Sequence, residues 1–272
     1  MAPATNVLDH IIHLSPPGKL DEAVAHWESL GFKVIPGGQH ADGLTSNALV
    51  SLADGVYIEL IAFIHPPSSY PPDHPRHTHW WAPKQPGWID WACLGLEDAV
   101  DETIHEREKQ AESGVGYQPG QVGGRVRAGD GKELKWRVTF PERKHGRGSV
   151  PFFCQDLTPR ELRVPSADTE THTNTALGIS HIHLSVPADT FSKVKAQLSV
   201  VLDSRFDEAS TEWELALPQS VQAATRTPRL RLSTARAGAT TSSIDEVGFF
   251  VSRSKDQVDT PKGFGKVVFV DI

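Results

Sequence analysis

Several side chains in this 272-residue sequence have the types and spacing needed for catalysis or metal binding. Glu59 lies inside the apolar run 57–63, where a buried carboxylate is costly unless an arginine, a hydroxyl or a metal ion contacts it. His181 and His183 are two residues apart, so on a strand they share one face, a spacing that can chelate a metal ion. His40 follows two glycines and is either part of a ligand-binding loop or a solvated loop histidine.

A proline-rich segment, residues 65–86, adds a second group of histidines. Its members lie close together in the sequence: His74, His77 and His79. They could bind a metal ion non-specifically, but the prolines favour an extended, irregular loop. We therefore expect a lid in which Trp80 and Trp81 cover one end of the fold.

The first part of the chain contains a series of elements with a clear order. Residues 6–14 are apolar and rich in Ile, and Pro16 and Pro17 end this pattern, as is typical of a strand. An amphipathic helix follows before Gly31, because apolar residues recur at three- and four-residue intervals: Leu20, Val24, Trp27 and Leu30. Three strand-like runs separated by glycine-containing turns come next, over residues 32–35, 46–52 and 56–64.

The same order of strand, helix and three strands recurs twice, so we expect repeated βαβββ modules. Residues 88–94 align with residues 7–13, and Ser180-His181 aligns with Asp9-His10, although the third copy is the most eroded. The expected divisions are a first module (6–64), the lid (65–86), a second module (87–164), a polar linker (165–177), a third module (178–251) and a C-terminal segment with a final strand (252–272).

The composition of the chain limits the classes of binding partner and the cellular compartments that we expect. The chain has 27 basic and 34 acidic residues, a net charge of -7, and no basic run that would attract nucleic acid or an anionic membrane. Its two cysteines, Cys93 and Cys154, lie outside any CxxC or CxH motif, which fits a reducing compartment. The start of the chain lacks a signal-peptide pattern and no stretch reaches ~20 apolar residues. We therefore expect a cytoplasmic protein that could also enter the nucleus by diffusion.

Several stretches resemble the glyoxalase-like branch of the vicinal oxygen chelate superfamily. They cover most of residues 6–190 and include LDHIIHL, GFKVIPGGQHADGLTSNALVSLADGVYIELIAF, ELKWRVTFP, VPFFCQDLTPRE and HTNTALGISHIHLSV. The resemblance implies an α+β fold in which paired βαβββ modules form a half-barrel. Its concave face commonly holds a small ligand with vicinal oxygens and a divalent metal ion, such as Zn, Mg, Mn, Ni or Fe. Lyases, isomerases, ring-cleaving dioxygenases and metal-free antibiotic-binding proteins share this fold, so the fold alone does not give the reaction.

The resemblance also implies where metal ligands lie, on the first and fourth strands of each paired module. In the first module these positions hold His10 and Glu59, and strand alternation supports the assignment. In the second module they hold Trp91 and either Cys154 or Gln155. An amide is a poor ligand for Zn²⁺, although Mg²⁺ or Ca²⁺ accepts it, so we do not expect a full four-ligand site. Either a weaker site remains at His10 and Glu59, completed by water, or the cavity works without metal.

Three residues of the second module are candidates for substrate binding. Arg137 alternates with apolar residues in a strand, where it could hold a carboxylate or phosphate with two hydrogen bonds, or pair with Glu133 or Asp156. Trp91 and Gln155 are candidates because they occupy the positions that metal ligands would otherwise fill.

Two functions from different classes fit these observations. The first is a lyase, isomerase or hydrolase of a small oxygenated metabolite. In this enzyme a divalent metal at His10 and Glu59 polarises an oxygen, and Glu59 or His40 is the base when no metal is bound. The second is a metal-free binding protein of the bleomycin-resistance type, with an aromatic pocket for a flat ligand. Modules of this kind often complete one another's barrels, so a homodimer is also compatible with the sequence.

Overall fold

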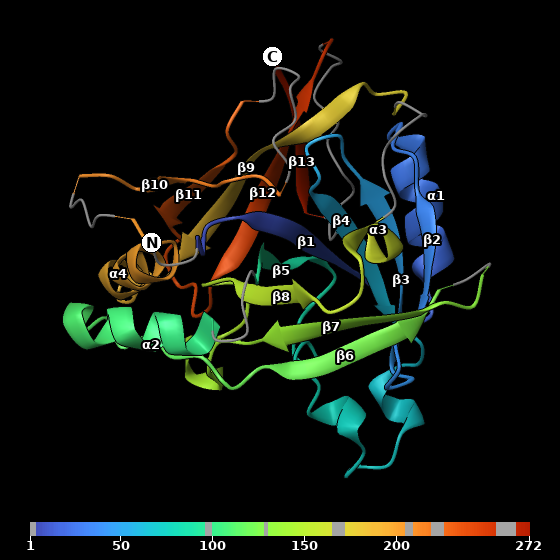
Figure 1. Ribbon diagram of the computed structural model, residues 1–272, viewed down its shortest axis with the longest axis horizontal. Helices are drawn as coiled ribbons and strands as arrows, with labels where there is room; N and C mark the ends of the chain where they lie inside the picture. Colours follow the sequence, from blue (N-terminus) through green and yellow to red (C-terminus); the bar gives the residue numbers. More distant parts are fainter. Residues whose placement is uncertain are drawn as a thin grey trace.

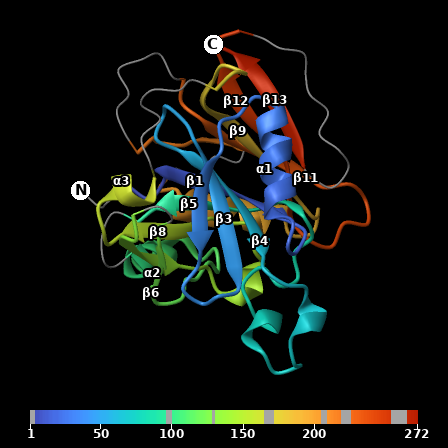
Figure 2. The same cartoon turned by 90° about the vertical axis from the view of Figure 1, so that its right-hand side faces the viewer.

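The computed structural model describes residues 4–95, 100–127, 130–164, 172–204, 209–218, 226–253 and 265–272. Two β-sheets form the body of the protein, and the longer helices lie at its periphery (Figures 1 and 2). The first sheet has eight strands in the order β2-β3-β4-β1-β5-β8-β7-β6. These strands are β1 (Leu8–Ser15), β2 (Ile35–Gln39), β3 (Thr45–Ser51), β4 (Tyr57–Phe63), β5 (Gly87–Leu94), β6 (Gln121–Val126), β7 (Glu133–Thr139) and β8 (Phe152–Asp156).

The first sheet consists of two halves with the same pairing pattern. β4 runs parallel to β1, and β8 runs parallel to β5. β1 and β5 join the halves as an antiparallel pair in which His10 lies opposite Ala92. Helices α1 (Leu20–Ser29) and α2 (Val100–Ala111) follow the first strand of each half, so both halves have the expected βαβββ order.

The two ends of this sheet meet, and the sheet curls almost into a barrel. His40, just beyond β2, forms a β-bridge with Arg125 in β6. The edges come so close that a side chain at Gly38 would lie 3.1 Å from the carbonyl oxygen of Val126. Glycine at this position therefore permits the contact between the two edges, which encloses the concave face.

The edge strand β2 differs from its expected position. We predicted a strand over residues 32–35 followed by a turn at Pro36, but β2 covers residues 35–39 and includes that turn sequence. Proline is tolerated on an edge strand, and a bulge between Pro36 and Gly38 interrupts the pairing with β3. The later end of β2 brings His40 to the line where the sheet closes.

The second sheet has five strands in the order β10-β11-β9-β12-β13. They are β9 (Ala176–Val186), β10 (Glu212–Glu214), β11 (Arg229–Thr234), β12 (Ser243–Val251) and β13 (Lys266–Asp271), and α4 (Phe191–Val201) follows β9. β11 is parallel to β9 as β4 is to β1, and β12 is antiparallel to β9 as β5 is to β1. By this pairing β9 and β11 correspond to β1 and β4 of the first sheet. β12 and β13 correspond to β5 and β8.

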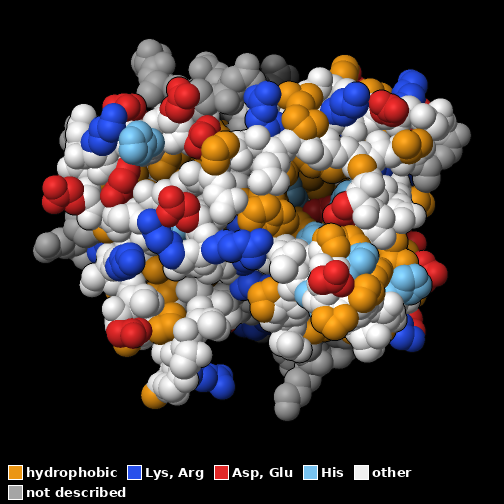
Figure 3. Space-filling model, turned by 90° about the horizontal axis from the view of Figure 1, so that it is seen from below, with side chains coloured by type: hydrophobic (Ala, Val, Ile, Leu, Met, Phe, Trp, Pro, Cys, Tyr) orange, Lys and Arg blue, Asp and Glu red, His pale blue; other side chains and the backbone are white. Residues whose placement is uncertain are grey.

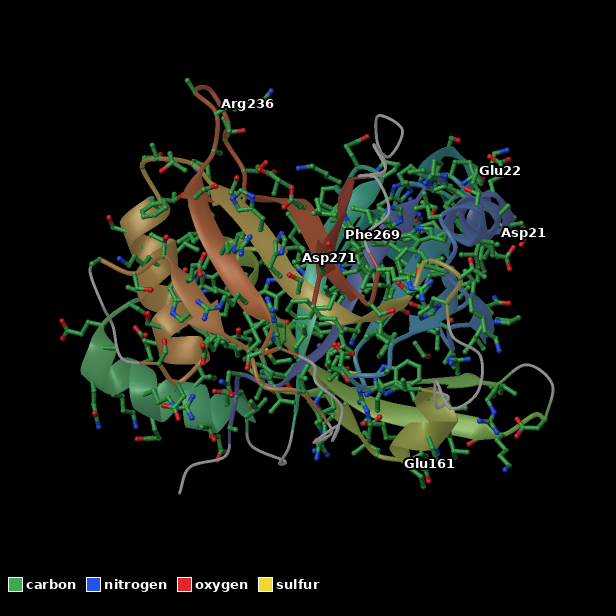
Figure 4. The ribbon with its side chains drawn as sticks, turned by 90° about the horizontal axis from the view of Figure 1, so that it is seen from above. Asp21, Glu22, Glu161, Arg236, Phe269 and Asp271 are labelled. Carbon is green, nitrogen blue, oxygen red and sulfur yellow. The ribbon has the colours of Figure 1, made fainter. Side chains whose placement is uncertain are left out.

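One large hydrophobic core lies between the two sheets. The outer face of the first sheet contributes Trp88, the second sheet contributes Phe249, and α1 contributes Trp27. The rings of Trp27 and Trp88 meet edge to face with centroids 5.6 Å apart. α1 packs in this orientation because it is amphipathic, and its Asp21 and Glu22 point away from the body (Figure 4).

The α+β class expected from the sequence is confirmed. In the described part of the chain no helix has the length and apolar composition needed to cross a membrane. Residues 165–171 of the expected linker lie outside the described residues. His172, which follows them, packs on the first module, because its Nδ1 accepts a hydrogen bond from the Lys33 N–H at 2.9 Å and its Nε2 lies 3.1 Å from the Ser51 carbonyl. The remaining helices are short: η1 (Pro67–Ser69), η2 (Pro75–His77), η3 (Arg143–His145) and α3 (Arg160–Arg163).

Candidate functional site

The concave face of the first sheet encloses a cavity with a volume of about 340 Å³. Figure 3 shows a hollow in which histidine and acidic side chains lie among hydrophobic ones. The apolar wall of the cavity is aromatic and consists of Trp80, Trp81, Trp136, Phe140 and Phe152. A cavity of this size and composition suits a small molecule with a few polar groups.

Residues 65–86 supply part of this wall. The indole N–H of Trp81 donates to Asp90 at 2.8 Å, and the ring of Trp80 packs on Phe140 with centroids 4.3 Å apart. The guanidinium of Arg76 lies over the ring of Phe63, 3.4 Å from its centroid. These contacts fasten the segment to the barrel and place both tryptophans on the cavity.

His10 is held in one orientation by Asp9. Oδ2 of Asp9 lies 2.7 Å from Nδ1 of His10. Burial alone would raise the pKa of Asp9, but Arg163, Arg160 and His10 together outweigh it and hold the pKa well below its usual range. Because Asp9 is therefore a carboxylate, Nδ1 of His10 carries the proton and donates it. The other ring nitrogen, Nε2, faces Glu59 across the cavity.

The ring of His10 is also clamped by its neighbours. Tyr57 stacks on it with centroids 4.6 Å apart, and Phe152 meets it edge-on at 5.3 Å. The Tyr57 hydroxyl accepts a hydrogen bond from Nη1 of Arg163 at 2.7 Å. Burial raises the pKa of Tyr57, so its hydroxyl stays protonated at neutral pH.

The carboxylate of Glu59 faces His10 across the cavity. Its Oε2 lies 3.8 Å from Nε2 of His10, and its Oε1 lies 3.5 Å from Nε2 of His40. Asn47 donates its side-chain N–H to Oε1 at 2.6 Å. The side chain is mostly buried, and one amide and two imidazoles surround the carboxylate.

Two further histidines of the cavity are neutral near pH 7. Burial lowers the pKa of His40, which Glu59 and Asp42 only partly oppose, and its Nδ1 lies 2.7 Å from the Thr45 hydroxyl. Burial also lowers the pKa of His79 to about 4, despite the nearby Asp42. Both rings can therefore accept protons, and His40 is the one beside Glu59.

The structure brings three of the residues singled out in the sequence into one site. His10, Glu59 and His40 all line the cavity, and the two histidines contact opposite oxygens of the carboxylate. His40 is not a solvated loop residue, because only 16% of its side chain is exposed.

Trp91, which was expected to bind substrate, does not line the cavity. Trp91 is fully buried in the core between the sheets, and its indole N–H donates to the Gly148 carbonyl at 3.2 Å. It pairs with Ile11, whereas Ala92 lies opposite His10. Bulges in the pairing of β1 with β5 shift the register, and a shift of one residue moves a side chain to the other face of a strand.

Arg137 and Gln155, the other two residues expected to bind substrate, contact each other. Arg137 donates from Nη1 to the Gln155 side-chain oxygen at 3.0 Å, and neither residue lines the cavity. Their strand neighbours Trp136, Val138 and Cys154 line it instead. Side chains alternate between the faces of a strand, so Arg137 and Gln155 lie on the outer face.

Several residues of the site were missed in the sequence. Asp9 and Asn47 are polar residues inside otherwise apolar strands, the same signal that identified Glu59. His79 carried a weaker signal as one of three histidines in the lid, and it is the one that lines the cavity. Arg125 carried none, because its role depends on the closure of the sheet between β2 and β6.

Comparison with known proteins identifies the family. A family model described as a glyoxalase-like domain matches residues 8–202. The chain belongs to the glyoxalase-like domain family. The resemblance to this branch of the vicinal oxygen chelate superfamily is thus confirmed over most of the chain. No curated protein matches this glyoxalase-like protein.

Solved structures share the fold of the glyoxalase-like protein. A hypothetical protein from Staphylococcus aureus aligns with a TM-score of 0.68 and 15% identity, over 97% of this chain and 99% of that chain. A mutant of 4-hydroxymandelate synthase from Streptomyces coelicolor aligns with a TM-score of 0.51 and 11% identity, over 92% of this chain and 72% of that chain. At these identities the likeness shows the fold and not the reaction.

The donors of the glyoxalase-like protein fit an open divalent-metal site. The described residues contain no group of three or more His, Cys, Asp or Glu side chains arranged as a metal cage. The second half of the sheet offers Ala92 and Cys154 near the cavity, and burial raises the pKa of Cys154, so this side chain is a thiol. His10 Nε2 and the Glu59 carboxylate are nevertheless suitable donors for a hard or borderline divalent ion. Water or a bound ligand would supply the other positions.

Proposed function

We propose that the cavity is the active site of an enzyme that moves a proton on a small oxygenated compound, as a lyase or an isomerase does. One observation carries the proposal: Nε2 of His10 lies 3.8 Å from Oε2 of Glu59 inside the cavity. Asp9 orients His10 through Nδ1, so that Nε2 points at the Glu59 carboxylate. His10 Nε2 and the Glu59 carboxylate would hold a divalent cation, which would offset the cost of burying the carboxylate.

A divalent cation held by His10 and Glu59 would supply Lewis-acid polarisation of a ligand oxygen. The other tasks fall to side chains of the chain itself. His40 is neutral at pH 7, so it can accept a proton from the bound compound. Trp80 and Trp81 exclude water from the same space.

Metal titration tests this proposal without knowledge of the substrate. Protein treated with a chelator is titrated calorimetrically with Mn²⁺ and with Zn²⁺, and one ion per chain is expected. His10→Ala and Glu59→Gln should each weaken binding by more than about tenfold, whereas the control His181→Ala should leave it unchanged. A wild-type protein that binds neither ion, or variants that bind as tightly as wild type, would refute the proposal.

A metal-free binding protein is the second candidate function. The aromatic wall of the cavity favours it, because such a wall can hold a flat ligand by stacking alone. This function predicts that a flat aromatic compound quenches tryptophan fluorescence equally in the wild-type protein and in Glu59→Gln, with no ion bound to either.

A further inference from the structure

Two buried arginines, Arg125 and Arg163, line the cavity, and within the part of the chain that the structure describes only Arg163 has carboxylate partners. Arg163 is 4% exposed and directs its donors at Asp9 and Asp156, with Nη1 3.1 Å from Asp9 and Nε 2.5 Å from Asp156. It also donates to the Tyr57 hydroxyl. Its charge is therefore neutralised within the protein, and its N–H groups are already used.

Arg125 lies in the same cavity without such a partner. It is 6% exposed, and its Nη1 donates to the Gly37 carbonyl at 2.5 Å. Its Nη2 makes only a long contact, 3.5 Å, with the Arg163 carbonyl. Among the described residues no carboxylate oxygen comes within 4.0 Å of its guanidinium. Backbone carbonyls thus accept hydrogen bonds from some of the five N–H groups of the Arg125 guanidinium. Its positive charge has no adjacent counter-ion among the described residues.

A buried cation without a counter-ion carries a free-energy cost, and a bound anion would lower that cost. Burial lowers the pKa of Arg125, and Glu59 partly opposes this effect across the cavity. A guanidinium nevertheless stays protonated in proteins, so the charge persists. A planar carboxylate matches its parallel N–H donors and forms two charge-assisted hydrogen bonds.

The position of Arg125 defines where the rest of the ligand lies. Its backbone forms the β-bridge with His40, whose side chain is next to Glu59. A ligand anchored on Arg125 therefore extends toward the pair formed by His10 and Glu59. The cavity volume of about 340 Å³ limits that ligand to a small molecule.

We infer that the cavity takes a small carboxylic acid, that Arg125 holds its carboxylate, and that a second oxygen of the same molecule reaches His10 and Glu59. This inference rests on the function proposed above, because it names the substrate class of the same cavity. Arg137, the arginine assigned to anion binding from the sequence, lies on the outer face and does not line this cavity.

A matched pair of probes tests the inference. Pyruvate and pyruvamide have the same adjacent ketone and differ in charge, so the ratio of their dissociation constants measures recognition of the carboxylate. Binding is followed by tryptophan fluorescence, with a chelator and again with saturating Mn²⁺. The wild-type protein should bind pyruvate about tenfold or more tightly than pyruvamide, the range of a hydrogen bond between two charged groups.

Variants separate recognition from a purely structural role of Arg125. Arg125→Gln should bring the ratio close to one, Arg125→Lys should keep part of it, and the control Arg137→Gln should keep all of it. If Arg125 only fastens β6 to β2, Arg125→Gln weakens both probes equally and the ratio stays. That result, or a wild-type protein that discriminates in neither condition, overturns the inference. The metal titration is scored independently, so the proposed function can stand when this inference fails.

Discussion

The two sheets of this protein place a histidine at the same point of the same motif and use it differently. In the first sheet, Nε2 of His10 faces Glu59 at 3.8 Å across a cavity. In the second sheet, Nε2 of His181 lies only 2.7 Å from Oε1 of Glu246, so the two are hydrogen-bonded. Gly248 packs so closely on the His181 ring that an added Cβ would lie 2.3 Å from it.

The difference teaches that a histidine contributes to a site only where its ring nitrogen faces a cavity and is not already hydrogen-bonded to a neighbour. β4, which runs parallel to β1, carries Glu59. β11, which runs parallel to β9, instead carries Arg231 opposite His183. The first sheet curls on itself and encloses its histidine, while the second sheet uses one face to cover the outside of the first. The repeated motif therefore preserves the position of the histidine, while the neighbouring side chains decide whether that histidine can bind a ligand.

The largest effect should come from the acid that orients His10. Asp9→Ala leaves Arg163 buried with one fewer carboxylate and should lower the free energy of unfolding by about 3–5 kcal/mol. Asp245 is the matched control, because it is an exposed acid of the second sheet that accepts a hydrogen bond from Ser185 at 2.5 Å. Asp245→Ala should cost less than about 1 kcal/mol. Equal losses in urea unfolding would remove the distinction between the two sheets.

A pH-dependent effect of comparable size is expected where the sheets join. Asp54, at the turn before β4, accepts the N–H of Ile179 in β9 at 2.8 Å, and burial raises its pKa to about 7. The folded protein keeps a proton that the unfolded chain releases near pH 4. Stability from this group is therefore present at low pH and is lost as the pH rises from about 4 to about 7, by up to about 4 kcal/mol.

Asp54→Asn tests this linkage because it keeps the shape of the side chain without the titration. The difference in unfolding free energy between wild type and Asp54→Asn should fall as the pH rises through this window. A difference that stays constant from pH 4 to pH 8 would show that Asp54 does not titrate as argued.

A smaller effect should separate the two sheets functionally. Gly248→Ala forces the His181 ring away from Glu246 and should cost about 1–3 kcal/mol, as overpacking does. Mn²⁺ and pyruvate binding should remain at wild-type levels, because the cavity belongs to the first sheet. A loss of Mn²⁺ binding in this variant would move the metal site to the second sheet.

Much of the fold follows from local sequence patterns, and the site follows only in part. The strand at residues 8–15 and the helix at residues 20–29 were predicted because their periodicity depends on adjacent residues alone. His10 and Glu59 were found because they occupy the ligand positions that the family resemblance implies, and Glu59 also interrupts an apolar strand.

The remaining site residues depend on contacts that periodicity does not contain. Trp91 was misplaced because a bulge changes which face of β5 it occupies. Arg125 was missed because its position in the cavity requires β6 to meet β2, which lies more than eighty residues earlier in the chain. Arg137 was preferred to Arg125 since alternation alone does not tell the concave face of a strand from the convex one.

A crystal structure of the protein grown with Mn²⁺ is the most direct test of the central claim. Anomalous scattering should show one ion within about 2.2 Å of both Nε2 of His10 and an oxygen of Glu59. An ion between His181 and Glu246 instead, or a cavity free of anomalous signal at saturating Mn²⁺, would contradict it.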